Sequence, residues 1–147
     1  MTPGPGTRNS VPAKDHSLSA LSEMPVISII DDDASVRIAT HNLIRSLGYK
    51  VQMFASAETF LESEQLDTTS CVIADVQMPG MNGVELQSHL RAQGRRLPFI
   101  FISAFPEETI RQRALRDGAI GFLAKPFDGC VLIDHLHAAL EEYRGKQ

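Results

Sequence analysis

Residues 72–83 read VIADVQMPGMNG, and this segment is the most informative one in the chain. Three apolar residues lead directly into Asp75, and a loop with proline and glycine follows within a few residues. An apolar run followed by turn residues is typical of a buried strand that ends in a tight turn. The pattern therefore predicts a strand over 70–75 that ends in an exposed carboxylate.

Two other apolar runs also end in charged residues. The run 26–30 is followed by Asp31 and Asp32, and the run 120–124 is followed by Lys125. Ligands of doubly wound α/β proteins bind beyond the carboxyl ends of parallel strands, where residues distant in sequence meet. If these runs are parallel strands, the three acids and the lysine form one site.

Helical patterns separate the apolar runs. In the first of them, Val36, Ala39, Leu43 and Leu47 recur at helical spacing and predict the buried face. Strands that alternate with helices through short connections predict an α/β fold, with a parallel sheet covered on both faces. The predicted strands are 26–30, 50–54, 70–75, 98–102 and 120–124, and the predicted helices are about 33–47, 56–63, 82–94, 107–117 and 128–143.

The composition suits a single globular domain. The chain has 147 residues, 43% of them hydrophobic, and a formal net charge of −4, which gives no electrostatic reason to bind nucleic acid. No apolar run is long enough to cross a bilayer, and no secretory signal opens the chain. Cys71 and Cys130 lack metal-type spacing, so we expect reduced thiols in a cytoplasmic protein.

The first 24 residues differ from the rest. They are rich in proline, glycine and polar residues and contain few large apolar groups, so they cannot bury enough surface to offset the entropy of ordering. We expect a disordered tail over 1–24, one folded domain over 25–143 and a short carboxyl-terminal tail over 144–147.

The clustered acids indicate a cation site. Carboxylates a few ångströms apart in a partly desolvated site repel one another unless some are protonated or a cation binds. Oxygen ligands suit Mg²⁺, and Asp31, Asp32 and Asp75 are the candidate ligands. The alternative is that residues 31–33 are only an acidic helix start, which the helix dipole favours. Asp33 is expected to cap that helix or to be a surface charge, with no metal role.

Phosphoryl chemistry fits the same residues. A carboxylate such as Asp75 can attack phosphorus and form an acyl phosphate, and a cation such as Lys125 can stabilise the developing charge. Ser103, which follows the predicted strand 98–102, could donate a hydrogen bond to a phosphoryl oxygen or only bond its own loop. Phe122 is by default a core residue.

Four segments of the chain belong together: IIDDD at 29–33, DVQMPGMNG at 75–83, ISA at 102–104 and KPF at 125–127. Together they resemble the receiver domain of two-component response regulators, in the style of the nitrogen-fixation regulators. The resemblance covers about 25–143 in the right order and spacing. It implies a flavodoxin-like, doubly wound five-stranded parallel sheet with strand order 2-1-3-4-5 and five helices.

The resemblance implies a role for each site residue. Asp75 would be the phosphoacceptor, and Lys125 would pair with it and then with its phosphoryl group. Mg²⁺ would be held by Asp31, Asp32, Asp75 and the backbone carbonyl of Gln77.

The resemblance also implies a switch and its partners. Ser103 would be the switch hydroxyl and Phe122 the switch aromatic, and the face built from the fourth helix, fifth strand and fifth helix would change shape. The phosphoryl donor would be a sensor histidine kinase or a phosphotransfer protein, and the output a downstream protein target. The domain would be a monomer or a phosphorylation-dependent dimer, with no direct nucleic acid contact.

The sequence departs from the common receiver pattern at a few positions. Asn82 stands where aspartate is common and, with Glu85 three residues later, predicts a capping box. Phe122 stands where tyrosine is frequent, so a phenol hydroxyl is not available to the switch. Gln77 and Phe105 occupy variable positions that tune phosphoryl lifetime in the family, and bulky Phe105 is expected to slow attack by water.

Three alternatives remain at this stage. The chain ends at Gln147, which suggests a stand-alone receiver but also fits a DNA-binding regulator truncated before its helix-turn-helix domain. A Mg²⁺-dependent aspartyl-phosphate phosphohydrolase is disfavoured, since Asp75 is followed by Val76-Gln77 rather than the D-x-D pattern and no segment is long enough to form a lid. A nucleotide-binding domain is disfavoured because the phosphate-binding glycine loops are missing. We therefore expect a binding and switching module rather than an enzyme.

Overall fold

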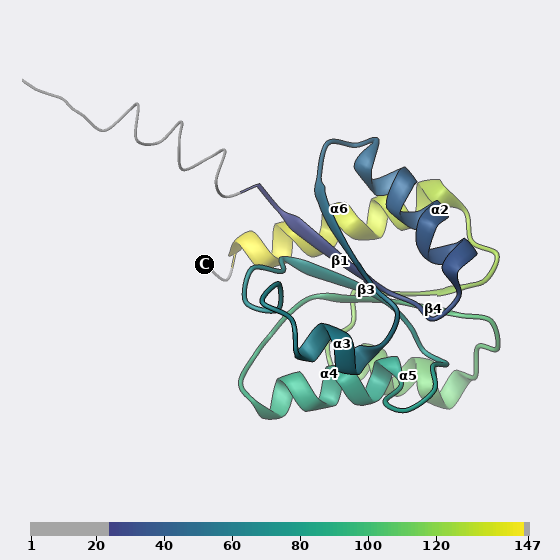
Figure 1. Ribbon diagram of the computed structural model, residues 1–147. Helices are drawn as coiled ribbons and strands as arrows, with labels where there is room; N and C mark the ends of the chain where they lie inside the picture. The colour runs from purple at the N-terminus through teal and green to yellow at the C-terminus, as the bar shows by residue number, and fades with distance from the viewer. Residues whose placement is uncertain (1–23, 146–147) are drawn as a thin grey trace, which may run out of the picture.

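The computed structural model describes residues 24–145, and in it five parallel strands form one sheet in the order β2-β1-β3-β4-β5 (Figure 1). This confirms the predicted α/β class and strand order. The predicted tail at 1–24 lies outside the described residues except for Met24, as do residues 146 and 147. The elements are β1 (Val26–Ile30), α2 (Ala34–Arg45), β2 (Lys50–Phe54), α3 (Ala57–Leu61), β3 (Cys71–Asp75), α4 (Gly83–Ala92), β4 (Phe99–Ser103), α5 (Glu108–Arg116), β5 (Gly121–Ala124) and α6 (Gly129–Gly145).

Helices cover both faces of the sheet. Figure 1 shows α2 and α6 on one face and α3, α4 and α5 on the other. Successive side chains of a strand point to opposite faces, so each strand supplies both layers. In β3, Val72 packs with the α3–α5 layer and Ile73 with the α2–α6 layer; in β4, Phe101 and Ile102 divide in the same way. Strands buried on both faces require such continuous apolar runs.

Side chains cap several helices as the sequence predicts. Asp33 caps α2 by accepting from the backbone N–H groups of Ser35 and Val36. Asn82 and Glu85 form the predicted capping box at the start of α4, each accepting the other's backbone N–H. These caps fix where α2 and α4 begin, directly after the residues that form the site described below.

The predicted buried face of α2 is wrong at two positions. Ala39 is exposed and Leu47 is 40% exposed, whereas Thr40 and Ile44 are the fully buried residues of the helix. The helix ends at Arg45, so Leu47 lies in the turn beyond it rather than on its inner face. The apolar pattern did not predict the burial of Thr40, because its side chain carries a hydroxyl.

The described residues include no helix long and apolar enough to cross a membrane. Both cysteines are free thiols: Cys71 is buried in β3, and Cys130 is exposed at the start of α6. Burial raises the pKa of the Cys71 thiol to about 12, which keeps it protonated and unreactive at neutral pH.

Candidate functional site

Four strands bring the predicted site residues to one edge of the sheet. Asp31 follows β1, Asp75 ends β3, Ser103 ends β4 and Lys125 follows β5. The chain leaves β1 for β2 on one side and returns to β3 on the other, so this edge contains the topological switch point. Pairing continues past β5, where Lys125 N donates to Ser103 O at 2.8 Å.

Lys125 lies between two buried carboxylates. Its Nζ is 3.1 Å from Asp31 Oδ2 and 3.2 Å from Asp75 Oδ2. Asp31 is 2% exposed and Asp75 is 4% exposed. The expectation of an exposed carboxylate at Asp75 is therefore wrong, because Asp75 ends a central strand and lies against Lys125. Buried charges of this kind persist where they are paired. Burial alone lowers the pKa of Lys125, but its contacts with the two carboxylates outweigh burial and raise it. Lys125 is therefore a fixed cation at this site.

The positive charge of Lys125 does not fully compensate the negative charges of the acidic side chains around it. Burial, together with repulsion from Asp31, raises the pKa of Asp75 to about 6, although Lys125 and the Gln77 backbone N–H lower it. Asp31 Oδ2 is buried, and the partner that the described residues offer it is Lys125 Nζ, in an ion pair. The site thus carries an excess of negative charge.

The acids also fit a divalent cation. One oxygen each of Asp31, Asp32 and Asp75 lies within 4.8 Å of the other two, and Asp32 is exposed at the mouth of the group. Three carboxylate oxygens open to solvent on one side suit Mg²⁺, which keeps several water ligands. A cation there would relieve the repulsion that raises the pKa of Asp75.

Neighbouring backbone N–H groups and the Arg37 side chain hold Asp31 and Asp75 in place. Asp31 Oδ1 accepts from Asp33 N at 2.9 Å, and the Asp31 carbonyl accepts from the Arg37 guanidinium at 2.6 Å. Asp75 Oδ1 accepts from Gln77 N at 3.2 Å. The Lys125–Pro126 peptide bond is cis.

The two predicted switch residues lie on neighbouring strands, Ser103 at the end of β4 and Phe122 within β5. Ser103 is fully buried, and its Oγ donates to Gln77 Oε1 at 2.9 Å rather than to Asp75. The ring of Phe122 is partly buried, with its centroid 6.3 Å from that of Phe101. Phe105 is 74% exposed, so in this conformation its ring does not cover the site.

Three contributors were not predicted from the sequence. The Gln77 side chain binds Ser103, whereas Gln77 was expected to offer its backbone carbonyl to the metal and to occupy a position that tunes phosphoryl lifetime. Glu58 of α3 accepts from Met81 N at 2.8 Å, which fixes the loop after β3 and lowers the pKa of Glu58. Gly83 approaches so closely that a Cβ would overlap the Asp75 carbonyl oxygen. No local pattern marks Glu58, which lies 23 residues from its partner.

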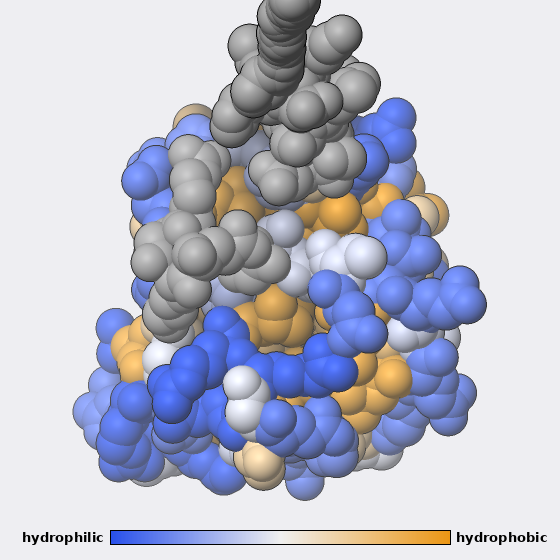
Figure 2. All heavy atoms as spheres, turned by 90° about the vertical axis from the view of Figure 1, so that its left-hand side faces the viewer, coloured by the Kyte–Doolittle hydropathy of each residue, from blue (hydrophilic) through white to orange (hydrophobic). Residues whose placement is uncertain are grey.

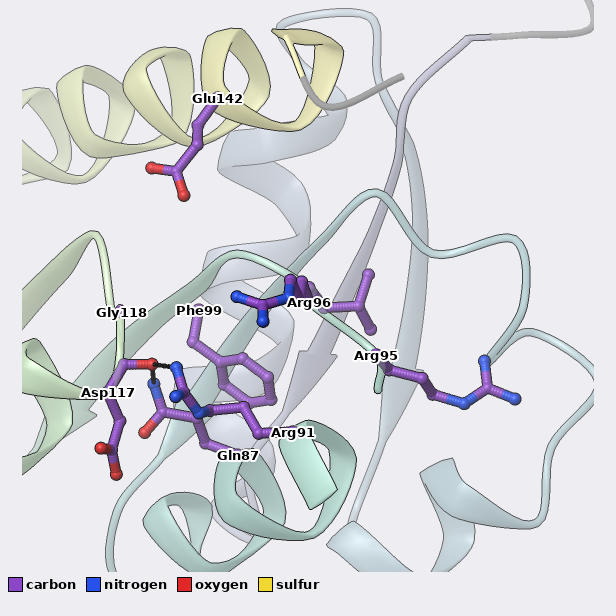
Figure 3. A pocket seen from close by; sticks show the side chains of 9 residues that line it. Gln87, Arg91, Arg95, Arg96, Phe99, Asp117, Gly118 and Glu142 are labelled. Atoms are coloured by element: carbon purple, nitrogen blue, oxygen red, sulfur yellow. Dashed lines mark hydrogen bonds between the residues drawn. The ribbon is translucent and has the colours of Figure 1, made fainter. Parts of the chain in front are cut away.

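A separate cavity of about 120 Å³ lies at the opposite end of the sheet. Figure 2 looks onto this end, where hydrophilic side chains surround apolar patches. Figure 3 shows that Arg91 and Gln87 of α4 reach the Asp117 carbonyl, whereas Arg95 points away from the cavity. Arg95 pairs with Asp67 at 2.6 Å. Because these groups are bound by other parts of the chain, we assign the cavity a structural role.

The fold and the acidic site define a doubly wound α/β domain with its site at the switch point. Residues 27–137 match the family model described as "Response regulator receiver domain", and the chain belongs to that family. The resemblance noted in the sequence is thereby confirmed.

Relatives from bacterial regulatory systems match over most of this chain. Nodulation protein W of Bradyrhizobium diazoefficiens is 36% identical over 126 residues, which are 86% of this chain and 56% of that protein. Response regulator protein TodT of Pseudomonas putida is 39% identical over 116 residues, 79% of this chain and 51% of that protein. The chain spans about half the length of the curated relatives it matches.

Solved structures agree with these matches. The response regulator StyR is 39% identical with a TM-score of 0.78, and the match covers 84% of this chain and 62% of that one. The FixJ-N structure is 30% identical with a TM-score of 0.71, covering 80% of this chain and 94% of that one. Residues 27–137 therefore form a receiver domain of the two-component response regulator type.

Proposed function

We propose that Asp75 accepts a phosphoryl group and that the domain is a phosphorylation-controlled switch. The observation that carries this proposal is the position of the Asp75 carboxylate: it lies at the end of β3, 3.2 Å from Lys125 Nζ and beside two further acids. A nucleophile, a fixed cation and a cation-binding group of oxygens are the parts that phosphoryl transfer needs.

The donor would be a phosphohistidine on a sensor histidine kinase or a phosphotransfer protein. An Asp75 carboxylate oxygen would form a bond to phosphorus while the phosphorus–nitrogen bond breaks, and the departing imidazole would keep the bonding electron pair. Lys125 would stabilise the charge on the phosphoryl oxygens. At neutral pH most of Asp75 is ionised even with a pKa of about 6, so the nucleophile is available.

Asp31, Asp32, Asp75 and the backbone carbonyl of Gln77 would hold Mg²⁺. The ion would neutralise charge on the donor's phosphoryl group and so reduce its repulsion from the acids. Two of these ligands, Asp31 and Asp75, also contact Lys125 Nζ, so the metal ion would lie beside a carboxylate pair that already holds one cation.

The output would pass through the face formed by α5, β5 and α6. Ser103 would exchange its present partner for a phosphoryl oxygen, and Phe122 would change its packing against Phe101.

We propose a downstream protein as the target and either a monomer or a phosphorylation-dependent dimer as the active form. Several relatives are named as transcriptional regulators, for example TdiR of Thauera aromatica. A receiver that works without an output domain stays a prediction, as do the boundaries 25–143 and the cytoplasmic location.

The test is the intact mass of the protein after incubation with Mg²⁺ and acetyl phosphate. Wild type should gain one phosphoryl group and Asp75→Asn none, while the control Asp134→Asn, an exposed residue of α6, should behave like wild type. Gain by Asp75→Asn equal to that of wild type would overturn the assignment. Sustained release of many equivalents of phosphate per protein would favour a phosphohydrolase instead.

A further inference from the structure

The Gln77 side chain bridges Ser103, the last residue of β4, and Phe105, in the loop that leads from β4 to α5. Its Oε1 accepts from Ser103 Oγ at 2.9 Å, and its Nε2 donates to the Phe105 carbonyl at 3.4 Å. Phe105 N donates to Ser103 Oγ at 3.1 Å and closes the ring of bonds. A carbonyl cannot donate, so the amide nitrogen must face Phe105 and the amide oxygen must face the serine hydroxyl.

The two ends of α5 are held differently. At the carboxyl end, Gln87 Nε2 donates to the carbonyls of Ala114 and Asp117, and the Arg91 guanidinium also donates to Asp117 (Figure 3). These bonds satisfy carbonyls that a helix end leaves open. Of the nine described residues of α5, Ala114 alone is fully buried, and it lies near this end. The carboxyl end of α5 is therefore anchored to α4.

The amino end of α5 has weaker support. Glu107 precedes the helix and makes no capping bond with its side chain, and residues 104–109 are all exposed. Among the hydrogen bonds described above, two tie this end of α5 to the acceptor site. Gln77 Nε2 donates to the Phe105 carbonyl, and Phe105 N donates to Ser103 Oγ.

We propose that Gln77 is a positioning residue that latches the amino end of α5, and that α5 pivots about its anchored carboxyl end when the latch opens. This inference rests on the proposed function. A hydroxyl has one hydrogen to donate, so Ser103 cannot donate to Gln77 and to a phosphoryl oxygen on Asp75 at the same time. Phosphorylation and the latch therefore compete for the same proton.

The competition predicts an energetic penalty on the phosphorylated conformation. Breaking one or two neutral hydrogen bonds shifts a two-state equilibrium by about three- to tenfold. Removing the latch should relieve this penalty. This effect of Gln77 differs from the role expected of its variable position, which is to tune the rate at which water attacks the phosphoryl group. The latch acts on the conformational equilibrium instead, and it requires the Ser103 hydroxyl.

The test uses beryllofluoride, a non-covalent mimic of the phosphoryl group, titrated with Mg²⁺. Gln77→Met is close in shape and makes neither hydrogen bond, while its backbone carbonyl stays in place. It should bind beryllofluoride about three- to tenfold more tightly than wild type. Gln93→Met, at the exposed end of α4, is the control and should not differ from wild type.

A double variant separates the latch from a general structural effect. In a Ser103→Ala background the latch has no hydroxyl to hold, so adding Gln77→Met should give no further tightening. If Gln77→Met tightens binding as much without the hydroxyl, it does not act through Ser103 and the proposal is wrong.

Hydrogen exchange tests the pivot and remains informative without the ligand. In the free protein, Gln77→Met should speed amide exchange at residues 105–110 and leave 114–118 unchanged. In wild type, beryllofluoride should change exchange over the same first segment more than over the second. Unchanged exchange at 105–110 in free Gln77→Met would overturn the latch, and a uniform change along α5 would overturn the pivot. If wild type neither binds beryllofluoride nor gains a phosphoryl group, the proposed function fails separately.

Discussion

Lys125 Nζ lies 3.2 Å from Asp75 Oδ2, although fifty residues separate the two in the chain. The lysine is only 15% exposed, so its charge acts in a medium of lower polarity than water. The same cation that would stabilise a phosphoryl group also repels a second cation. Its two effects can therefore be separated by experiment.

We expect Lys125→Met to bind Mg²⁺ more tightly and to accept a phosphoryl group more slowly. Loss of the positive charge leaves Asp31 and Asp75 without their ion-pair partner, which favours a bound metal ion. The rate of phosphoryl gain from acetyl phosphate should fall by about tenfold or more, because one charge-stabilising group is lost. Calorimetric Mg²⁺ titration and timed intact mass measure the two effects. Lys50→Met, on an exposed residue of β2, should change neither, and weaker Mg²⁺ binding by Lys125→Met would contradict the argument.

Asp75→Asn should stabilise the metal-free protein at pH 7.5 but not at pH 4. The pKa of Asp75 is raised from 3.8 to about 6 in the fold, mainly by burial. Between these values the folded state keeps a proton that the unfolded chain has lost, so stability falls as pH rises from 4 to 6 and stays lower above. Asparagine never ionises, so the variant avoids this loss of unfolding free energy, which is about 1–3 kcal/mol. Urea unfolding in the presence of a chelator measures it.

The control for this effect is Asp134→Asn, since Asp134 is an exposed residue of α6. It should change the free energy of unfolding little at either pH. A stabilisation by Asp75→Asn that is the same at pH 4 and pH 7.5 would mean that packing, rather than the charge of Asp75, is responsible.

The sequence predicted those features that follow from local pattern and parallel topology. The bounds of β1 and β2 agree with prediction, and the strand ends place Asp31, Asp75 and Lys125 together because parallel strands share their carboxyl edge. Capping by Asn82 could be predicted because both partners lie within one turn of helix.

Features that depend on contacts between distant loops could not be predicted in this way. The bond from Ser103 to Gln77 requires the exact approach of the loops after β3 and β4, and the bond from Met81 to Glu58 requires the placement of α3. The burial of Thr40 depends on where α2 meets the sheet, which polarity alone does not reveal.

Mg²⁺ should raise the stability of wild type and not that of Asp32→Asn. Asp32 supplies one of the three clustered oxygens but is exposed, so its loss should remove affinity without harming the fold. At a Mg²⁺ concentration of about 100 times Kd the gain in unfolding free energy is about 2.7 kcal/mol. Thermal unfolding with and without Mg²⁺ measures the gain.

The neighbouring acid provides a matched control. Asp33 caps α2, so Asp33→Asn, which can still cap, should keep the basal stability close to that of wild type. It should also keep the gain from Mg²⁺. An equal loss of that gain in Asp32→Asn and Asp33→Asn would point to diffuse charge rather than to a defined ligand set.

Gly83→Ala should destabilise the protein, although alanine favours helices by about 1 kcal/mol over glycine. Gly83 begins α4, and a Cβ there would overlap the Asp75 carbonyl and lie 3.2 Å from the Phe101 ring. A backbone carbonyl in a central strand cannot move aside, so we expect a cost of about 2–3 kcal/mol. At Gly129 the Cβ would instead meet the terminal methyl of Leu43, which can rotate, so Gly129→Ala should cost less than about 1 kcal/mol. Urea unfolding of both variants measures the difference. Equal stabilities would show that the backbone of β3 can shift at Asp75. The backbone that positions the Asp75 carboxylate would then be less rigid than its packing indicates.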